Sequence, residues 1–322
     1  METVQATTSP THDCERRRAI VNPGCQEFRM TVSFKDAESR GSPSRRYRVE
    51  KTLHSTQYAS VLLAEEEDSK RQVVIKRGKK TKQGSSSDEA TNEAIIFRKL
   101  GLHENIVHVF DLAEDKQNVE IVMERVHQDL FSHVSASHGV TEAKARHLFR
   151  QLVRALQHLH HKDIAHLDLS LENILVDSEL DILKLCDFGS AVEAKRGGAR
   201  VLNLVARRLN YAAPELVEGQ PVDVFQADVY SLGALLFMML FGHPAYDIEG
   251  GKKNGKMAMR YATAGSAMLK KLLSAYGHYT RGNPKTPSDT VVDLLARMLT
   301  LDPAKRIQLD DIPKHPWLDS NN

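Results

Sequence analysis

The residues best suited to carry out chemistry lie in two short stretches of the chain, "HLDLSLEN" and "CDFG". Asp168 and Asn173 are five residues apart in the first stretch, and Asp187 lies in the second. Phosphoryl transfer needs little covalent work from a protein, but it needs a metal ion, a cation on the phosphates and a group that orients the acceptor hydroxyl. These oxygen-bearing side chains, together with Lys76 at the end of the apolar run "VVIK", are candidates for those roles.

The composition is that of a globular protein with a nearly balanced charge. The chain has 322 residues, enough for two packed lobes, and is 41% apolar and 27% charged. Lys plus Arg number 44 and Asp plus Glu number 42, so the net charge of +2 argues against nucleic acid as the main partner. The basic run "KRGKKTK" at 76–82 is therefore interpreted as a solvated loop.

The cysteines, the N-terminus and the apolar runs all favour an intracellular protein that does not bind membranes. Three cysteines are too few for a disulfide framework and indicate a reducing compartment. The polar N-terminus lacks the apolar core of a secretory signal. The longest apolar run, residues 232–241, is too short to span a bilayer and is interpreted as a buried helix. We expect a cytoplasmic location, with the nucleus as an alternative, and no pattern indicates the oligomeric state.

The first part of the chain is predicted to be an extension followed by a β-rich region. Residues 1–46 are rich in Thr, Ser, Pro and Arg and are predicted to be disordered, apart from a short strand over 28–34. A helix is predicted over 87–100, where Ser86 and Glu89 form a capping box. Apolar residues with a period of two predict further strands over 47–53, 58–66, 71–78, 105–114 and 119–126.

Beyond residue 126 the pattern becomes mainly helical, which predicts an α+β fold. A strongly amphipathic helix is predicted over 141–163. A small β-rich lobe over 47–125 would then pack against a larger α-helical lobe over 126–318, with a ligand cleft between them. The leucines on one face of the predicted helix are Leu148, Leu152, Leu156 and Leu159.

Residues 47–318 resemble the catalytic domain of eukaryotic protein kinases of the serine/threonine type. The matching pieces occur in the family's order and near its spacing. They are "VVIK" (73–76), Glu93, "HLDLSLEN" (166–173), "CDFG" (186–189), "YAAPE" (211–215), "DVYSLG" (228–233), "DPAKRI" (302–307) and "HPWL" (315–318). The resemblance implies a two-lobed kinase fold. It also implies Mg²⁺-dependent transfer of the γ-phosphate of ATP to Ser or Thr hydroxyls of protein substrates.

The resemblance assigns roles to the residues named first. Lys76 would bind the α- and β-phosphates of ATP and pair with Glu93, although a surface lysine at a strand end is the alternative. Asp168 would accept or orient the hydroxyl proton of the substrate. Asn173 and Asp187 would hold Mg²⁺ through hard oxygen ligands.

The resemblance also implies an adenine pocket. Met123 falls at the position that limits the depth of this pocket, and core packing is a compatible alternative for it. Glu124 and Val126 would offer backbone groups to the base. The side chains expected to sandwich the base are Leu53, Val61, Val74 and Leu175.

Structural roles are implied for residues of the larger lobe. Glu215 and Arg306 resemble a buried ion pair that braces this lobe, and Asp228 resembles the carboxylate that holds the catalytic loop. Cys186 is interpreted as a small buried residue rather than a reactive one.

The first departure from the family lies in the loop that covers the phosphates. Where the family has three glycines, this chain has His54, Thr56 and Ala59, and only the aromatic Tyr58 is kept. Glycines allow a backbone to approach a phosphate closely. We therefore predict weak ATP binding, with a KM in the upper part of the usual range of about 1 μM to 1 mM.

The second departure concerns switching by phosphorylation. Leu167 replaces the arginine that in most of the family binds a phosphate on the activation segment. That segment, residues 187–215, contains Ser190 and Tyr211 but no hydroxyl residue over 191–210. We hypothesise that phosphorylation of this segment does not switch the protein on.

The third departure pairs Ser170 with Arg208. Ser170 stands where serine/threonine kinases have a lysine, and Arg208 stands where they have the threonine that meets it. We hypothesise that the two roles are exchanged, with Arg208 supplying the positive charge and Ser170 the hydroxyl, because arginine binds phosphate in a bidentate way. The alternative is that Arg208 faces solvent beside Arg207.

The main hypothesis is therefore an active protein serine/threonine kinase. Tyrosine specificity is less expected, because positions 170 and 172 carry Ser and Glu where tyrosine kinases have an arginine. A pseudokinase scaffold with weak nucleotide binding is the alternative, and the missing glycines are the argument for it.

Overall fold

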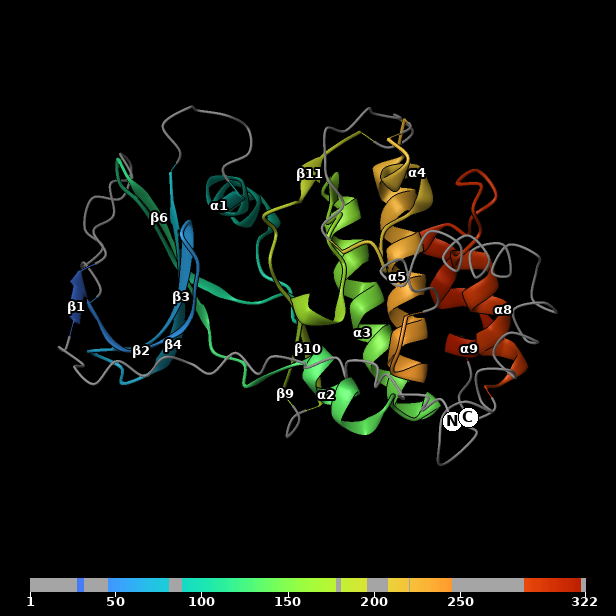
Figure 1. Cartoon of the computed structure of the whole chain (residues 1–322), viewed down its shortest axis with the longest axis horizontal. Coiled ribbons are helices and arrows are strands. Elements are labelled where there is room, and N and C mark those ends of the chain that lie inside the picture. Colours follow the sequence, from blue (N-terminus) through green and yellow to red (C-terminus); the bar gives the residue numbers. More distant parts are fainter. Residues whose placement is uncertain are drawn as a thin grey trace, which may run out of the picture.

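The computed structural model describes residues 28–31, 46–80, 89–177, 181–195, 208–219, 221–244 and 287–319. Three features predicted from the sequence lie outside these residues. They are the disorder expected over residues 1–46, except for the strand near residue 28, the capping residue Ser86, and Arg207, which precedes Arg208. A β-sheet occupies one end of the molecule and helices occupy the other (Figure 1). The predicted α+β, two-lobed fold is thereby confirmed.

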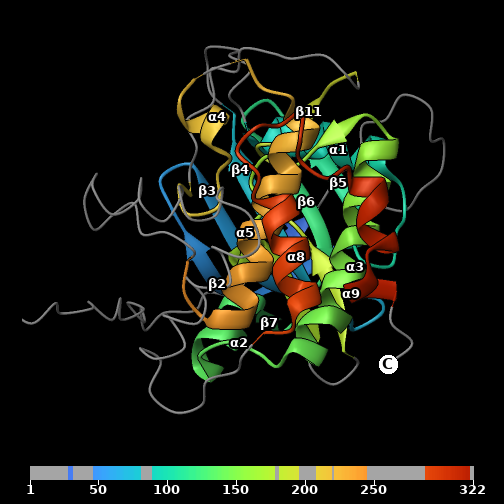
Figure 2. The same ribbon diagram turned by 90° about the vertical axis from the view of Figure 1, so that its right-hand side faces the viewer.

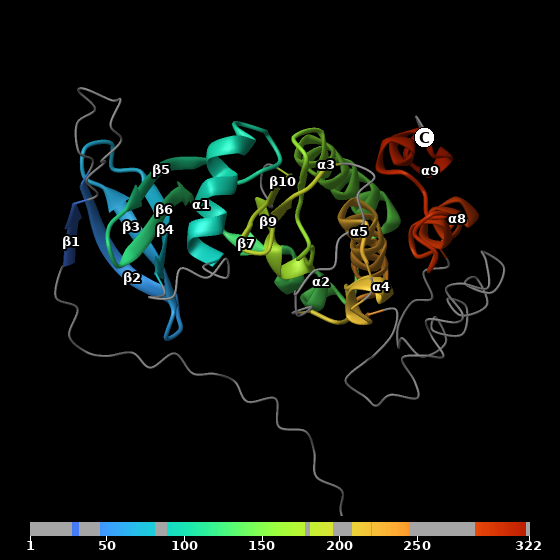
Figure 3. The same cartoon turned by 90° about the horizontal axis from the view of Figure 1, so that it is seen from above.

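A six-stranded sheet forms the smaller lobe, with strand order β1-β2-β3-β4-β6-β5. The alternation of β4 places Val73 and Ile75 in one hydrophobic cluster and sends Val74 and Lys76 to the opposite face. Helix α1 (Glu89–Leu100) covers that opposite face (Figure 3). The strands are β1 (Phe28–Thr31), β2 (Arg46–Ser55), β3 (Ala59–Glu66), β4 (Gln72–Lys79), β5 (Val109–Glu114) and β6 (Asn118–Glu124).

The five strands predicted over 47–126 are confirmed to within two residues at their ends, except for one strand start. Strand β5 begins at Val109 rather than at Asn105. The side chain of Asn105 donates instead to the carbonyl of Leu183 over 3.1 Å, and the N–H of Val107 donates to the carbonyl of Leu185 over 2.9 Å. These residues therefore join the small lobe to strand β10 (Ile182–Leu185) of the larger one.

The larger lobe is built around two long helices, α3 (Glu142–His161) and α5 (Val224–Phe241). Helix α5 contacts both α3 and α8 (Asp289–Met298) and lies between them in Figure 1, whereas α8 is seen between α5 and α3 in Figure 2. All four leucines predicted on one face of α3 are fully buried. Helix α5 is long and apolar enough to cross a membrane, but 94% of it is buried inside the lobe, as the sequence predicted for a core helix.

Short elements on the side of α3 and α5 nearest the sheet carry the loops of interest. Strands β9 and β10 form the antiparallel hairpin expected between Asn173 and Asp187. These elements are β7 (Gln128–Asp129), α2 (Leu130–Ser137), β8 (Ile164–Ala165), η1 (Leu171–Asn173), β9 (Ile174–Asp177) and β11 (Val192–Glu193). The larger lobe also contains α4 (Pro214–Val217), η2 (Leu309–Lys314) and α9 (Pro316–Asp319).

A buried ion pair joins α4 to the C-terminal segment. The guanidinium of Arg306 contacts the two carboxylate oxygens of Glu215 at 2.8 and 3.2 Å, and Arg306 is 2% exposed. The same guanidinium donates to the carbonyls of Thr300, Leu301 and Gln226. The N–H groups of the Arg306 guanidinium therefore all have hydrogen-bond acceptors. The buried ion pair with Glu215 agrees with what the resemblance implied.

Replacing Arg306 by methionine should lower the free energy of unfolding by roughly 3–5 kcal/mol, because Glu215 would be left buried and unpaired. Urea unfolding followed by circular dichroism measures the change. The matched control is Lys314→Met, which breaks an ion pair between the exposed Lys314 and Asp311 and should change stability little. Equal losses in the two variants would contradict the structural role of the buried pair.

Candidate active site

Asp228 of helix α5 accepts hydrogen bonds from the backbone of the loop that carries Asp168. The carboxylate of Asp228 is fully buried and accepts the backbone N–H groups of His166 and Leu167, each over 2.8 Å. His160 of helix α3 also contacts this carboxylate over 2.9 Å. Leu167 has a positive φ of 60°, a conformation that a leucine rarely adopts, and the two bonds to Asp228 hold it there. The expected role of Asp228 agrees with this geometry.

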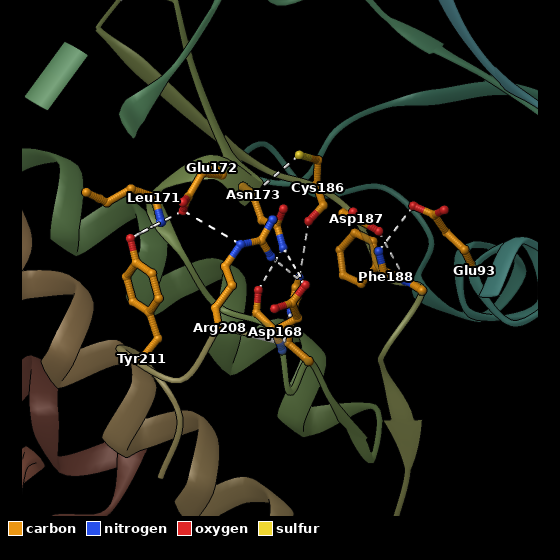
Figure 4. A network of polar contacts seen from close by, with 12 residues as sticks. Glu93, Asp168, Leu171, Glu172, Asn173, Cys186, Asp187, Phe188, Arg208 and Tyr211 are labelled. Carbon is orange, nitrogen blue, oxygen red and sulfur yellow. Dashed lines mark hydrogen bonds and ion pairs between the residues drawn. The ribbon is translucent and has the colours of Figure 1, made fainter. Parts of the chain in front are cut away.

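Asp168 and Asn173 lie in direct contact, as Figure 4 shows. The side-chain amide of Asn173 donates to the carboxylate of Asp168 over 3.0 Å and to its carbonyl over 2.8 Å. The backbone of Asn173 accepts the N–H of Cys186 over 3.0 Å, which ties the loop to the end of β10. The amide oxygen of Asn173 remains the group able to ligate a cation.

Lys76 brings the two lobes together at Asp187. Its ammonium lies 2.6 Å from the carboxylate of Glu93 and 2.9 Å from that of Asp187. Burial alone would lower the pKa of Lys76, but the two carboxylates outweigh it and raise the pKa above its usual range. Burial opposes ionisation of Asp187, yet Lys76 holds the pKa of this carboxyl below its ordinary value. Lys76 is thus a partly buried, paired cation and not a surface lysine.

Arg208 is partly buried and contacts the carboxylate of Asp168. Its guanidinium donates to Asp168 over 2.7 Å and lies 3.9 Å from Glu172 (Figure 4). Burial would lower the pKa of Arg208, and Asp168 more than offsets this. The alternative in which Arg208 faces solvent is therefore wrong. Ser170 is fully buried, and no partner for its hydroxyl is found in the described part of the chain, so the expected pairing is not a direct contact.

The turn between β2 and β3 hydrogen-bonds to itself. The hydroxyl of Thr56 accepts the N–H of Ala59 over 3.0 Å and that of Tyr58 over 3.3 Å. The N–H of Thr56 donates to the carbonyl of Ala59 over 2.8 Å. The resemblance implies that a glycine loop would direct such amides at the phosphates, so these internal bonds agree with the predicted weak binding of ATP, which stays a prediction.

The residues expected around adenine come from strands β2, β3, β4, β6 and β9 and from the residues that follow β6. Met123 is 8% exposed and packs in the core. The N–H of Glu124 donates to the carbonyl of His108 over 2.9 Å, so one of the backbone groups that Glu124 was expected to offer is already used. Val126 follows the end of β6. The four residues expected to sandwich the base are at least partly exposed, as an interface with a ligand requires; they are Leu53, Val61, Val74 and Leu175.

Asn92 and Glu172 also belong to this network, and the sequence did not predict either. Asn92 donates to the carbonyls of Gly189 and Ala191, and Glu172 accepts the hydroxyl of Tyr211 over 3.3 Å. Their position next to Glu93 and Asn173 was the only sign available in the sequence.

Residues 47–318 match the family model of the protein kinase domain. The chain belongs to the protein kinase family. It is 32% identical over 276 residues to serine/threonine-protein kinase SIK1 of Mus musculus, covering 85% of this chain and 33% of the relative. It is 28% identical over 307 residues to probable serine/threonine-protein kinase KCC4 of Saccharomyces cerevisiae, covering 90% of this chain and 28% of the relative.

A further relative is the maternal embryonic leucine zipper kinase of Xenopus tropicalis, which is 30% identical over 273 residues, covering 84% of this chain and 39% of the relative. The kinase chain thus spans between 28% and 39% of the length of these curated relatives. The kinase family uses ATP as its phosphate donor, and most of its members use Mg²⁺.

Cys186 of the folded kinase should resist alkylation. Burial raises the pKa of its thiol, and the thiol donates to the carbonyl of Asn173 over 3.3 Å, so little thiolate forms near pH 8. Iodoacetamide should modify Cys186 at least about tenfold more slowly in the folded protein than in urea. Peptide mass spectrometry separates this site from Cys14 and Cys25. By accessible surface Cys186 is only partly buried, rather than buried as the sequence predicted, and equal rates in both states would contradict its low reactivity.

Proposed function

We propose that this kinase transfers the γ-phosphate of ATP to Ser or Thr hydroxyls of protein substrates, with Mg²⁺ as cofactor. The observation that carries the proposal is the connected set of charges in the site. Lys76 contacts Glu93 and Asp187 at ion-pair distance, and Asp168 contacts Asn173 in the adjoining loop. Membership of the family and the names of the relatives support the same activity.

Lys76 is placed to bind the phosphates of ATP. Glu93 and Asp187 hold its ammonium at the boundary between the lobes. A fixed cation at this point stabilises negative charge without having to reorganise during the reaction. Lys76 would contact the α- and β-phosphates and so orient the γ-phosphate.

Asp168 is placed to receive the proton of the acceptor hydroxyl. Asn173 and Arg208 donate to its carboxylate and hold it in one orientation. As the substrate oxygen attacks the γ-phosphorus, its proton would pass to Asp168 and the bond to the β-γ bridging oxygen would break, releasing ADP.

Asn173 and Asp187 fit a magnesium ion. Their amide and carboxylate oxygens are the hard ligands that Mg²⁺ prefers. Asn173 uses its amide nitrogen to donate to Asp168, and one carboxylate oxygen of Asp187 contacts Lys76. Each residue keeps one oxygen for a metal. When bound, Mg²⁺ would neutralise the charge of the phosphates.

Arg208 would supply the positive charge that the family's lysine at position 170 provides and that Ser170 cannot. Because its guanidinium lies 2.7 Å from Asp168, it would face the phosphoryl group as this passes to the substrate. The proposed partners are protein substrates. A cytoplasmic location, with the nucleus as an alternative, stays a prediction from the sequence.

Asp168→Asn should abolish most phosphate transfer, because an amide cannot accept the proton of the hydroxyl. The measurement is incorporation of radioactive phosphate from ATP into generic protein substrates, with the wild type beside the variant. Thermal shift with Mg²⁺ and millimolar ATP should be similar for both, because Asp168 is not proposed to bind adenine. Equal incorporation by the two proteins would remove the assigned role. The absence of both incorporation and thermal shift in the wild type would favour the scaffold.

Arg208→Met should lower kcat by about 10²-fold, as expected when one electrostatic stabiliser of a transition state is removed. Arg208→Lys keeps a charge but loses the bidentate donor, so it should retain more activity than the methionine variant. Steady-state kinetics with a fixed peptide substrate measures both. A loss below about threefold for Arg208→Met would be too small for a transition-state contact.

A further inference from the structure

Asn92 joins helix α1 to the backbone that follows Asp187. Its side-chain amide donates to the carbonyl of Gly189 over 3.0 Å and to that of Ala191 over 2.8 Å, with the carbonyl of Phe188 at 3.5 Å. The residues it connects are about a hundred positions apart and belong to different lobes. One side chain thus uses both of its donor hydrogens on the start of the activation segment.

Glu93, the next residue of α1, binds the same segment with the opposite polarity. Its carboxylate accepts the N–H of Phe188 over 3.1 Å, as Figure 4 shows. One turn further along, Phe97 packs edge-to-face on Phe188 with ring centroids 5.0 Å apart. Donor, acceptor and apolar groups on one face of α1 therefore hold residues 188–191 in a single position.

The segment is also anchored on the side of the larger lobe. Strand β11 pairs with β8, and the N–H of Ala194 donates to the carbonyl of Asp163 over 2.9 Å. Leu167 packs in an apolar cluster with Val192 and Phe225. Position 167 therefore makes apolar contact with the segment and offers no charge to a phosphate.

No phosphate is needed for these contacts. The sequence has no hydroxyl residue over 191–210, and the position expected to bind a phosphate is Leu167. The start of the segment is held by hydrogen bonds from Asn92 and to Glu93, by the ion pair of Lys99 with Glu193 and by apolar packing, all of which form without covalent modification.

We propose that Asn92 is a positioning residue of the kinase, which holds the start of the activation segment against α1 and so keeps Asp187 beside Lys76 and Glu93 without phosphorylation. This inference rests on the proposed function for its effect on catalysis. Its effect on the segment itself can be observed independently of activity.

Asn92→Leu and Asn92→Asp are the informative variants. Leucine has a similar size and a higher helix propensity than asparagine, so weakening of α1 cannot explain its effect. Aspartate is nearly isosteric but presents oxygen atoms to carbonyl oxygens. If only the volume at position 92 mattered, both variants would behave as the wild type.

Hydrogen exchange of the peptide that contains residues 188–191 gives the first readout. Both variants should exchange this peptide about tenfold faster, because two hydrogen bonds that order it are lost. Exchange of the core helix α5 and the melting temperature should stay at the wild-type values. A fall in overall stability alone would change exchange in α5 as well. Ile95→Ala, at an exposed position of the same helix, is the matched control and should leave both regions unchanged.

Steady-state kinetics gives the second readout. In both Asn92 variants kcat should fall by about tenfold or more, since misplacement of Asp187 is costly. The KM for ATP should change far less, because the residues expected around adenine are not touched. Wild-type exchange and kcat in both variants would overturn the proposal. So would faster exchange with unchanged kcat. Faster exchange in a protein whose wild type transfers no phosphate would keep the anchoring role and reject the proposed function.

Discussion

The ion pair between Lys76 and Glu93, shared with Asp187, is the interaction on which the site depends. Lys76 comes from a strand, Glu93 from a helix and Asp187 from a loop. The carboxylates of Glu93 and Asp187 lie 2.6 and 2.9 Å from the ammonium of Lys76. A buried ion pair contributes little net stability, because desolvation offsets much of the attraction, but removing one partner leaves a costly unpaired charge. The ion pair therefore serves mainly to fix Lys76, Glu93 and Asp187 in position relative to one another. If α1 moved away from the sheet, the carboxylate of Glu93 would lose its contact with the ammonium of Lys76.

The same use of buried charge fixes the frame beneath the site. Helix α5 contributes an apolar surface to the core of the larger lobe, and within that surface Asp228 is fully buried. Its carboxylate accepts two backbone N–H groups of the loop before Asp168, which keeps the loop in one conformation despite the positive φ of Leu167. Hydrophobic burial fixes the helix, and the helix then fixes the loop. A surface carboxylate on a mobile side chain could not transmit position in this way.

The sequence predicted those parts of the fold that depend on local periodicity. The strands of the small lobe, helix α3 and the buried helix α5 follow from periods of two and 3.6 and from continuous apolarity. The start of β5 was predicted too early because Asn105 and Val107 bind β10, a partner far away in sequence. Asn92 was missed for a similar reason, since its partners are carbonyl groups, which every residue carries. The motif spacing predicted a special position for Arg208, but the contact with Asp168 needed the three-dimensional structure.

The turn between β2 and β3 changes how ATP must be held. In this turn the hydroxyl of Thr56 occupies the N–H groups of Tyr58 and Ala59, so binding phosphate through those amides would first require breaking internal bonds. Each such bond is worth about 1 kcal/mol, whereas hydrogen bonds from charged donors are roughly twice as strong as neutral ones. Phosphate binding is therefore expected to depend on the ammonium of Lys76 rather than on the turn. A turn held by its own hydrogen bonds also loses little entropy when a ligand binds beneath it, which recovers part of the affinity that the absent glycines would have supplied.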